Sequence, residues 1–145
     1  MKIMFVCTGN TCRSPMAEAA AKAIFPKEGY EIISRGISVF ESTPASENAQ
    51  KAVAEGGLDL SQHMSKQISE EDIKTSDVIF TMTNPHKQML SAVCNRFNKP
   101  IFTLAEFTGN AEDISDPYGG SLEVYEKCFG QITKYVKEAA EIITK

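Results

Sequence analysis

Apolar positions along the chain fall into two alternating patterns. Short continuous runs rich in β-branched and aromatic residues predict buried strands at residues 2–6, 31–34, 77–81 and 99–104. Longer stretches with apolar residues three or four apart, or rich in helix formers, predict helices at residues 15–25, 46–55, 85–93 and 122–143. Strands that alternate with helices predict an α/β fold in which helices wrap a parallel sheet.

Helix-capping residues, prolines and glycines are expected to set the limits of these elements. Ser14 is expected to cap the first helix through its hydroxyl, with Pro15 at the first helical position. Pro26 and Gly29 are expected to end that helix. Residues 108–120 form a long polar, acidic loop, and loops of this length often carry function. Sites in parallel sheets gather at the carboxyl ends of the strands, where the first strand runs into Cys7.

The composition is that of an ordinary soluble domain. We expect the 145 residues to form one domain over residues 1–145, with 42% hydrophobic residues and a net charge of −4. This charge argues against a nucleic-acid partner, because nucleic-acid binders usually carry a basic excess. No apolar run of about 18 residues is present, so no membrane span is expected. The apolar N-terminus is short for a signal peptide, which predicts a cytoplasmic protein whose four cysteines are free thiols.

One segment carries candidate chemistry: Cys7-Thr8-Gly9-Asn10-Thr11-Cys12-Arg13-Ser14-Pro15, between the first strand and the first helix. Five residues separate Cys7 from Arg13. A loop of this kind, followed by a helix N-terminus, can direct backbone N–H groups at a tetrahedral dianion. Gly9 is expected to let the backbone turn where a side chain would clash. The spacing predicts a phosphate cradle.

The residue types in this cradle suit transfer of a phosphoryl group. The planar fork of Arg13 can hold two phosphoryl oxygens, and the N–H dipoles with the guanidinium favour the thiolate form of Cys7. Ser14 could donate a hydrogen bond to the Cys7 sulfur and ease its departure. Asp116, before Pro117 in the long loop, is the candidate acid that protonates the leaving group.

These motifs resemble the low-molecular-weight protein tyrosine phosphatase family, over nearly the whole chain. The resemblance implies a three-layer, flavodoxin-like fold with a four-stranded parallel sheet in the order 2-1-3-4. It implies Cys7 as nucleophile, Arg13 as phosphate clamp and Asp116 as general acid and later base, with no metal and no organic cofactor. The phosphate-binding residues would be Thr8, Gly9, Asn10, Thr11, Cys12, Arg13 and Ser14. Asn10, Ser14, Ser34 and His63 match a supporting hydrogen-bond network of the family.

The resemblance also addresses the substrate. Phe40 and Tyr118 fall where the family places the aromatic walls of its substrate slot. Thr11 stands where tyrosine phosphatases of the family usually have Ile, and the loop is similar to that of the protein-arginine phosphatase branch. A smaller, polar rim residue should favour a guanidinium over a phenyl ring, so phosphoarginine in proteins is the expected substrate. Tyr118 departs from the arginine-type pattern, which has Phe, and phosphotyrosine is the alternative.

Structural explanations compete with several of these interpretations. A lone cysteine after a strand is usually a buried apolar residue, but the spacing to Arg13 favours catalysis for Cys7. Cys7, Cys12 and His63 do not have the spacing of common zinc sites. Cys12 lies close enough in sequence to Cys7 for a disulfide under oxidants, which would make the enzyme redox-sensitive. Cys94 and Cys128 are expected in the core, and His86 on the surface.

Two other functions remain as alternatives. A thioredoxin-coupled arsenate reductase shares the Cys-x5-Arg loop, but it needs two further cysteines at short spacing, and Cys94 and Cys128 are far apart in sequence. A phosphoprotein-binding module would keep the cradle without turnover, and retention of Cys7, Arg13 and Asp116 together argues against it. We therefore expect a monomeric enzyme whose partners are the phosphorylated proteins it acts on.

Overall fold

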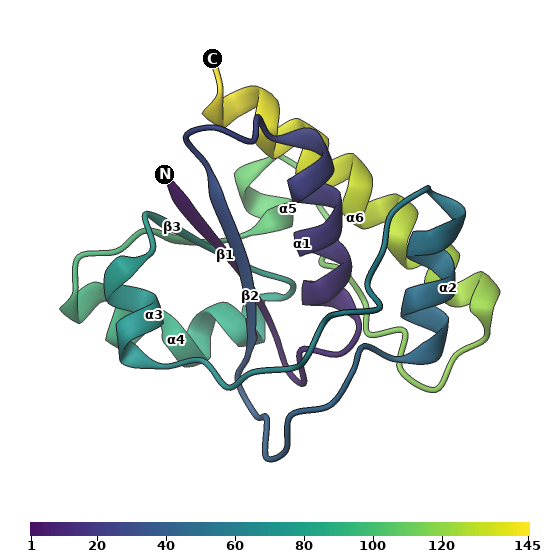
Figure 1. Cartoon of the computed structure of the whole chain (residues 1–145). Helices are drawn as coiled ribbons and strands as arrows, with labels where there is room; N and C mark the ends of the chain where they lie inside the picture. Colours follow the sequence, from purple (N-terminus) through teal and green to yellow (C-terminus); the bar gives the residue numbers. More distant parts are fainter.

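The computed structural model describes all 145 residues and places four parallel strands in the order β2-β1-β3-β4. The strands are β1 (Lys2–Cys7), β2 (Glu31–Gly36), β3 (Val78–Thr81) and β4 (Ile101–Thr103). The helices are α1 (Arg13–Ile24), α2 (Glu47–Glu55), α3 (Glu70–Thr75), α4 (Asn84–Arg96), α5 (Leu104–Phe107) and α6 (Leu122–Ile143). Figure 1 shows α1, α2 and α6 on one side of the sheet and α3 and α4 on the other. The expected three-layer fold and strand order are confirmed.

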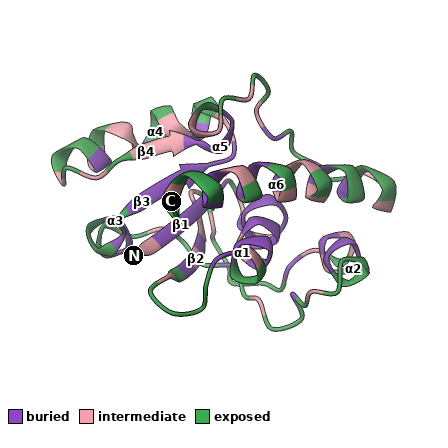
Figure 2. Cartoon of the chain, turned by 90° about the horizontal axis from the view of Figure 1, so that it is seen from above, coloured by how far each residue is buried: buried purple, intermediate pink, exposed green.

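Strand β1 is the centre of the molecule, because both of its faces are covered. Its side chains alternate between two core clusters: Ile3, Phe5 and Cys7 pack on the side of α1 and α6, and Met4 and Val6 pack on the side of α3 and α4. A continuous apolar run is what such a doubly covered strand requires. Figure 2 shows this central layer as the most deeply buried part of the fold. The alternation directs the Cys7 side chain toward the α1 face.

The outer edge of the sheet at β2 is partly closed by a loop segment. The Gly36 N–H donates to the Lys66 carbonyl, and the Ile68 N–H donates back to the Gly36 carbonyl. Isolated bridges also join Gly36 to Gln67 and Pro44 to Met64. The loop after β2 therefore lies against the chain just before α3. This arrangement places both segments beside the end of β1.

Two short helices were not expected from the sequence. Helix α3 begins with a capping box of Ser69 and Asp72, and α5 begins with one of Thr103 and Glu106. Helices of six and four residues are too short to show an apolar period, so only their caps could have revealed them. Strand β2 also continues to Gly36, beyond the expected residues 31–34.

The start of α1 corrects the expected cap. The helix begins at Arg13, the cap position is Cys12, and no side chain accepts a hydrogen bond from the first turn. Ser14 lies inside the helix, and Pro15 is its third residue. Proline is tolerated there because N–H groups of the first turn have no partner within a helix. The hydroxyl of Ser14 is used elsewhere, in the site that this helix N-terminus faces.

Candidate active site

The loop from Thr8 to Cys12 joins the carboxyl end of β1 to the N-terminus of α1. Its backbone turns at Asn10, which has a φ of 56° in the left-handed region. This corrects the role expected for Gly9, which has no positive φ and where a Cβ would meet only the Thr11 hydroxyl at 3.8 Å. Asparagine adopts this conformation more readily than most residues. The turn thus depends on Asn10 rather than Gly9.

The backbone N–H groups of this loop are largely unpaired. Asn10 donates to the Cys7 sulfur at 3.3 Å. No acceptor within the chain pairs with the N–H groups of five residues, Thr8, Gly9, Thr11, Cys12 and Arg13. The same five residues line a cavity of about 220 Å³ together with Cys7, Asp116 and Tyr118. Free amide donors at a helix N-terminus form a site for an anion.

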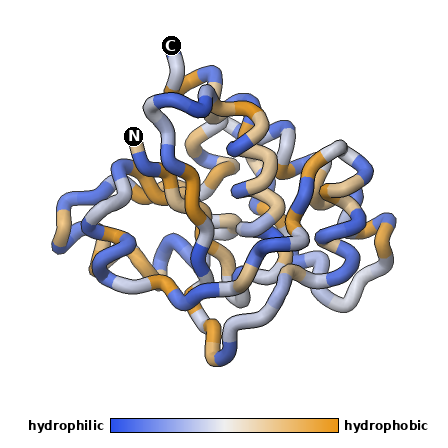
Figure 3. Tube along the Cα trace, in the orientation of Figure 1, coloured by the Kyte–Doolittle hydropathy of each residue, from blue (hydrophilic) through white to orange (hydrophobic).

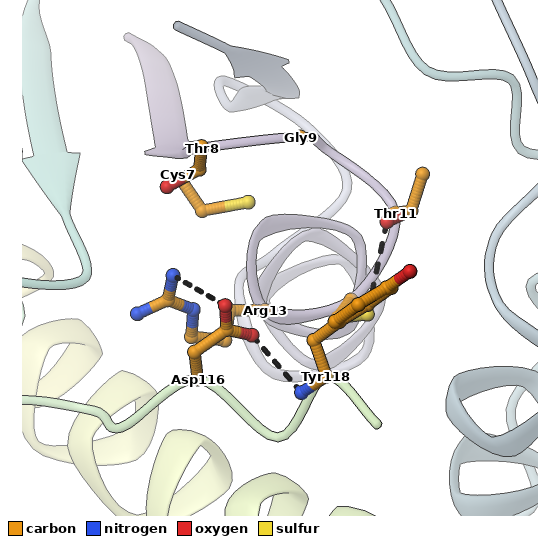
Figure 4. Close-up of a pocket in the computed structure, with 8 residues that line it drawn as sticks. Cys7, Thr8, Gly9, Thr11, Arg13, Asp116 and Tyr118 are labelled. Atoms are coloured by element: carbon orange, nitrogen blue, oxygen red, sulfur yellow. Dashed lines mark hydrogen bonds and ion pairs between the residues drawn. The ribbon is translucent and has the colours of Figure 1, made fainter. Parts of the chain in front are cut away.

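Cys7 lies at the floor of this cavity, and the residue is 3% exposed. The Ser14 hydroxyl oxygen lies 2.9 Å from its sulfur. Figure 4 shows the Cys7 sulfur, the Arg13 guanidinium and the Asp116 carboxylate around one opening. A thiolate here would have two hydrogen-bond donors and a nearby cation, as a cysteine nucleophile requires.

Asn10 is the centre of the hydrogen-bond network behind the loop. Its Nδ2 donates to the Ser14 hydroxyl at 2.8 Å and to the Ser34 hydroxyl at 3.1 Å, while its Oδ1 accepts from the Lys66 N–H at 3.0 Å. His63 Nε2 donates to the Asn10 carbonyl at 2.8 Å. Asn10 and Ser14 are fully buried. The structure therefore brings together all four predicted supporting residues, and it adds the backbone of Lys66.

Arg13 is held by the long loop that precedes α6. Its Nη1 donates to the Ile114 carbonyl at 2.9 Å, and its Nη2 lies 3.8 Å from Asp116 Oδ2. The other carboxylate oxygen of Asp116 accepts from the Tyr118 N–H at 3.1 Å. Asp116 is 55% exposed, so it can reach a bound group, whereas Arg13 is buried. The guanidinium and the carboxylate thus face the same opening.

The predicted specificity residues occupy different environments. Thr11 and Tyr118 both line the cavity, and Tyr118 is 79% exposed. Phe40 is fully exposed and is not among the lining residues. It lies in the loop after β2 that projects at the bottom of Figure 1, and Figure 3 shows a hydrophobic segment at the tip of that loop. The structure does not bring Phe40 to the cavity, and its role as a wall stays a prediction.

Comparison with known proteins identifies the family. The family model described as "Low molecular weight phosphotyrosine protein phosphatase" matches residues 2–145. The chain belongs to this family. Cysteine-dependent hydrolysis of phosphorylated proteins is therefore its activity.

Individual relatives of this phosphatase differ in the substrates that they are named for. A Bacillus subtilis protein named "Protein-arginine-phosphatase" is 38% identical over 148 residues, covering 100% of this chain and 98% of the relative. A Staphylococcus aureus protein named "Low molecular weight protein-tyrosine-phosphatase PtpB" is also 38% identical, with 99% of each chain covered.

Solved structures support the same relationship. The structure of YwlE arginine phosphatase with a phosphorylated active-site serine in place of cysteine has a TM-score of 0.92 at 35% identity, covering 100% of this chain and 97% of that one. A low molecular weight protein tyrosine phosphatase from T. tengcongensis has a TM-score of 0.91 at 39% identity, covering 98% and 99%. The phosphoserine in the first shows that the nucleophile position of that protein accepts a phosphoryl group.

The remaining cysteines of the phosphatase are buried, as expected. Cys94 packs with Met4 and Val6 on one side of the sheet, whereas Cys128 packs with the cluster that contains Cys7 on the other. Burial raises the pKa of Cys128 to about 12. Because the sheet separates the two thiols, they cannot relay a disulfide as an arsenate reductase requires. Cys12 contacts the Tyr125 hydroxyl at 3.4 Å, and its disulfide with Cys7 stays a prediction.

Three contributions to the site were missed in the sequence. His86, expected on the surface, is 6% exposed and contacts the phosphate loop through Thr8. The Ile114 carbonyl holds Arg13, and a backbone acceptor leaves no signal in a sequence. Gly36 lies so close to the loop that a Cβ would stand 2.9 Å from the Thr8 carbonyl oxygen. A glycine two residues after the predicted strand 31–34 was the available signal for this close approach.

No group of three or more His, Cys, Asp and Glu side chains is arranged to hold a metal ion. No helix combines the length and the apolar character that a membrane crossing needs.

Proposed function

We propose that this protein is a monomeric, cytoplasmic phosphatase that removes the phosphoryl group from phosphoarginine in proteins, through a phosphocysteine at Cys7 and without a metal or organic cofactor. One observation carries the proposal. Five unpaired N–H groups and the Arg13 guanidinium surround a cavity with Cys7 at its floor and Asp116 at its rim. This arrangement matches a phosphoryl group held in line between a sulfur nucleophile and a proton donor.

The first step transfers the phosphoryl group to sulfur. The Cys7 thiolate attacks phosphorus, the S–P bond forms, and the P–N bond to the arginine side chain breaks. Asp116 donates its proton to the departing nitrogen, so that arginine leaves with a complete guanidinium. The amide N–H groups and Arg13 bind the three equatorial oxygens as charge spreads over them.

The second step returns the enzyme to its starting state. A water molecule attacks phosphorus while the Asp116 carboxylate takes its proton. The S–P bond breaks, inorganic phosphate forms, and Cys7 leaves as a thiolate that accepts the Ser14 hydrogen bond. Asp116 thus serves as acid and then as base, and each turnover leaves it protonated again.

The preference for phosphoarginine rests on the rim of the cavity. Thr11 has its hydroxyl 3.7 Å from the Cys12 sulfur and offers little apolar surface to a phenyl ring. Asp116 beside it can contact a positively charged guanidinium. The Bacillus subtilis relative, which is named as a protein-arginine phosphatase, supports this choice.

Phosphotyrosine is the second candidate, and Tyr118 is the observation that favours it. Its exposed ring lines the cavity and could stack on the phenyl ring of a substrate. The Staphylococcus aureus relative named as a protein-tyrosine phosphatase has the same 38% identity to this chain.

A pair of matched peptides distinguishes the two candidates. Peptides of one sequence that carry phosphoarginine or phosphotyrosine are compared by kcat/KM for the wild type and for Thr11→Ile, with Thr144→Ile as a control on the exposed C-terminus. We expect the wild type to prefer phosphoarginine and Thr11→Ile to shift toward phosphotyrosine. A wild-type preference for phosphotyrosine would refute the arginine assignment, and an unchanged ratio in Thr11→Ile would remove Thr11 as the selector.

A further inference from the structure

His86 connects two elements that meet at the phosphate loop. It lies in the first turn of α4, and the residue is 6% exposed. Its Nδ1 lies 3.0 Å from the hydroxyl of Thr83, the residue that caps α4. Its Nε2 lies 2.8 Å from the hydroxyl of Thr8, the residue that follows Cys7. Both ring nitrogens are therefore hydrogen-bonded, one to a helix cap and one to the catalytic loop.

The ring is neutral at physiological pH. Burial, and next the positive charge of Arg13, lower the pKa of His86 to about 4, while Asp116 and Asp113 act in the opposite direction. A neutral imidazole has one N–H donor and one acceptor nitrogen, which is sufficient for its two threonine partners. A neutral ring also adds no second cation beside Arg13, so the guanidinium remains the main positive charge for the phosphoryl group.

The loop is held on both sides of Gly9, and the two sides are held differently. On the far side, Asn10 is fixed by His63, Ser34, Ser14 and the Lys66 backbone. On the near side, Thr8 makes only two hydrogen bonds: its carbonyl accepts from the Ser38 N–H at 2.9 Å, and its hydroxyl pairs with His86. The Thr8 side chain is otherwise exposed. His86 is thus the one side chain that fixes this half of the loop.

We propose that His86 is a positioning residue for phosphoryl transfer, which acts through the Thr8 hydroxyl. By fixing Thr8, the neutral imidazole sets the directions of the Thr8 and Gly9 N–H groups, which have no partner within the chain and line the cavity. These N–H donors bind the transferring oxygens more strongly in the transition state than in the ground state. Small displacements of the donors therefore lower the rate of phosphoryl transfer. This inference rests on the proposed phosphatase function and extends it to a residue outside the cavity lining.

Two conservative variants separate the two hydrogen bonds of the ring. A glutamine amide can occupy the position of Nε2 and keep the Thr8 contact, whereas an asparagine amide can occupy the position of Nδ1 and keep the Thr83 cap contact. We expect His86→Gln to retain most of the wild-type kcat/KM on an aryl phosphate and on a phosphoarginine peptide. We expect His86→Asn to lose about tenfold, the range of one hydrogen bond. Similar losses in both variants, or a greater loss in His86→Gln, would overturn the proposal.

A double-mutant cycle tests whether the effect passes through Thr8. His86→Asn is measured in the wild type and in Thr8→Val, which removes the hydroxyl, with Thr8→Ser as the variant that keeps it. The tenfold loss should disappear in the Thr8→Val background and should persist in the Thr8→Ser background. An undiminished loss in Thr8→Val would contradict the proposal. If His86→Asn does not fold, equal activities of Thr8→Val and Thr8→Ser would contradict it instead.

Binding of orthovanadate separates this inference from the proposed function. Vanadate affinity, measured by calorimetry, reports the cradle without turnover, and it should fall about tenfold in His86→Asn and little in His86→Gln. A wild type that hydrolyses no phosphorylated substrate would refute the phosphatase function, while the vanadate series would still decide the role of His86. If the wild type is active and all three proteins bind vanadate equally well, the role of His86 is refuted and the phosphatase function is not.

Discussion

The hydroxyl oxygen of Ser14 lies 2.9 Å from the sulfur of Cys7. Asn10 decides how this hydroxyl is used. Because Asn10 Oδ1 accepts from the Lys66 N–H, its Nδ2 faces Ser14 and donates to the hydroxyl oxygen. The Ser14 hydroxyl can therefore donate to a Cys7 thiolate at 2.9 Å, with the Arg35 carbonyl at 3.4 Å as its other acceptor, and this hydrogen bond stabilises the departing thiolate.

Ser14→Ala should therefore slow the second chemical step more than the first. Hydrogen bonds to charged groups contribute about 1.5–3 kcal/mol, which corresponds to a fall in kcat of roughly ten- to a hundredfold. Stopped-flow measurements on p-nitrophenyl phosphate should show a burst of nitrophenol followed by slow turnover. Ser38→Ala, whose side chain makes no hydrogen bond, is the control. A lower kcat without a burst would mean that Ser14 acts on the first step.

Asp116→Asn should remove the proton donor and keep the cradle. We expect kcat to fall by about 10²–10⁴, with the greater loss for substrates whose leaving groups need a proton most. Comparison of phenyl phosphate with p-nitrophenyl phosphate measures this dependence. Glu112→Gln, an exposed acid in the same loop, should leave the rates unchanged. An equal loss for both substrates would assign Asp116 a role other than that of general acid.

Gly36→Ala should distort the phosphate loop through direct contact. The added Cβ would stand 2.5 Å from Val39 Cγ2, 2.9 Å from the Thr8 carbonyl oxygen and 3.0 Å from Asn10 Cβ. Overpacking of this kind costs about 1–3 kcal/mol of unfolding free energy, and here it should also reduce activity. Gly130 lies in α6, where an added Cβ would meet no atom within 4 Å. Gly130→Ala should therefore raise the free energy of unfolding by about 0.5–1 kcal/mol. Denaturant unfolding of both variants measures the contrast, and a stable, fully active Gly36→Ala would contradict it.

His86 should make stability depend on pH between about 4 and 6.5. Because its pKa is lowered from 6.5 to about 4, the unfolded chain binds a proton in this range that the folded chain does not. The free energy of unfolding contributed by this group should then rise with pH, by on the order of 3 kcal/mol across the range. Urea unfolding at several pH values gives the free energy of unfolding of the wild type and of His86→Gln. The difference between the two isolates the contribution of His86. Parallel pH profiles would show that His86 does not titrate as described.

Much of the fold was predictable because its signals are local. The apolar run before Cys7, the helix formers after Pro15 and the spaced apolar residues of α6 each predicted an element that the structure contains. The short helices α3 and α5 were missed, because only a capping box distinguishes them. The start of α1 was misplaced because Ser14 resembles a cap in sequence, while its hydroxyl pairs with Cys7 and Asn10.

The site was predictable to the extent that its groups lie in one motif or match the family. Cys7, Arg13 and Ser14 come from one segment. Asp116 could be identified as the acid because the chain also contains that segment. The burial of His86 was not predictable, because it results from the packing of α4 against a loop distant in sequence. Its Thr83-x-x-His86 spacing was a local signal for the cap contact alone. The approach of Gly36 to the loop likewise depends on the pairing of β1 with β2.

We expect each phosphoryl group to pass through a covalent bond to the Cys7 sulfur. Ser14→Ala should slow hydrolysis of the intermediate more than its formation, so this variant is mixed with ³²P-labelled phosphoarginine peptide, quenched rapidly, digested and analysed by mass spectrometry. We predict one phosphoryl group on the peptide that contains Cys7, and none in the Cys7→Ala variant. Steady turnover by the wild type with no phosphoryl group on Cys7, or with the label on another residue, would contradict the account.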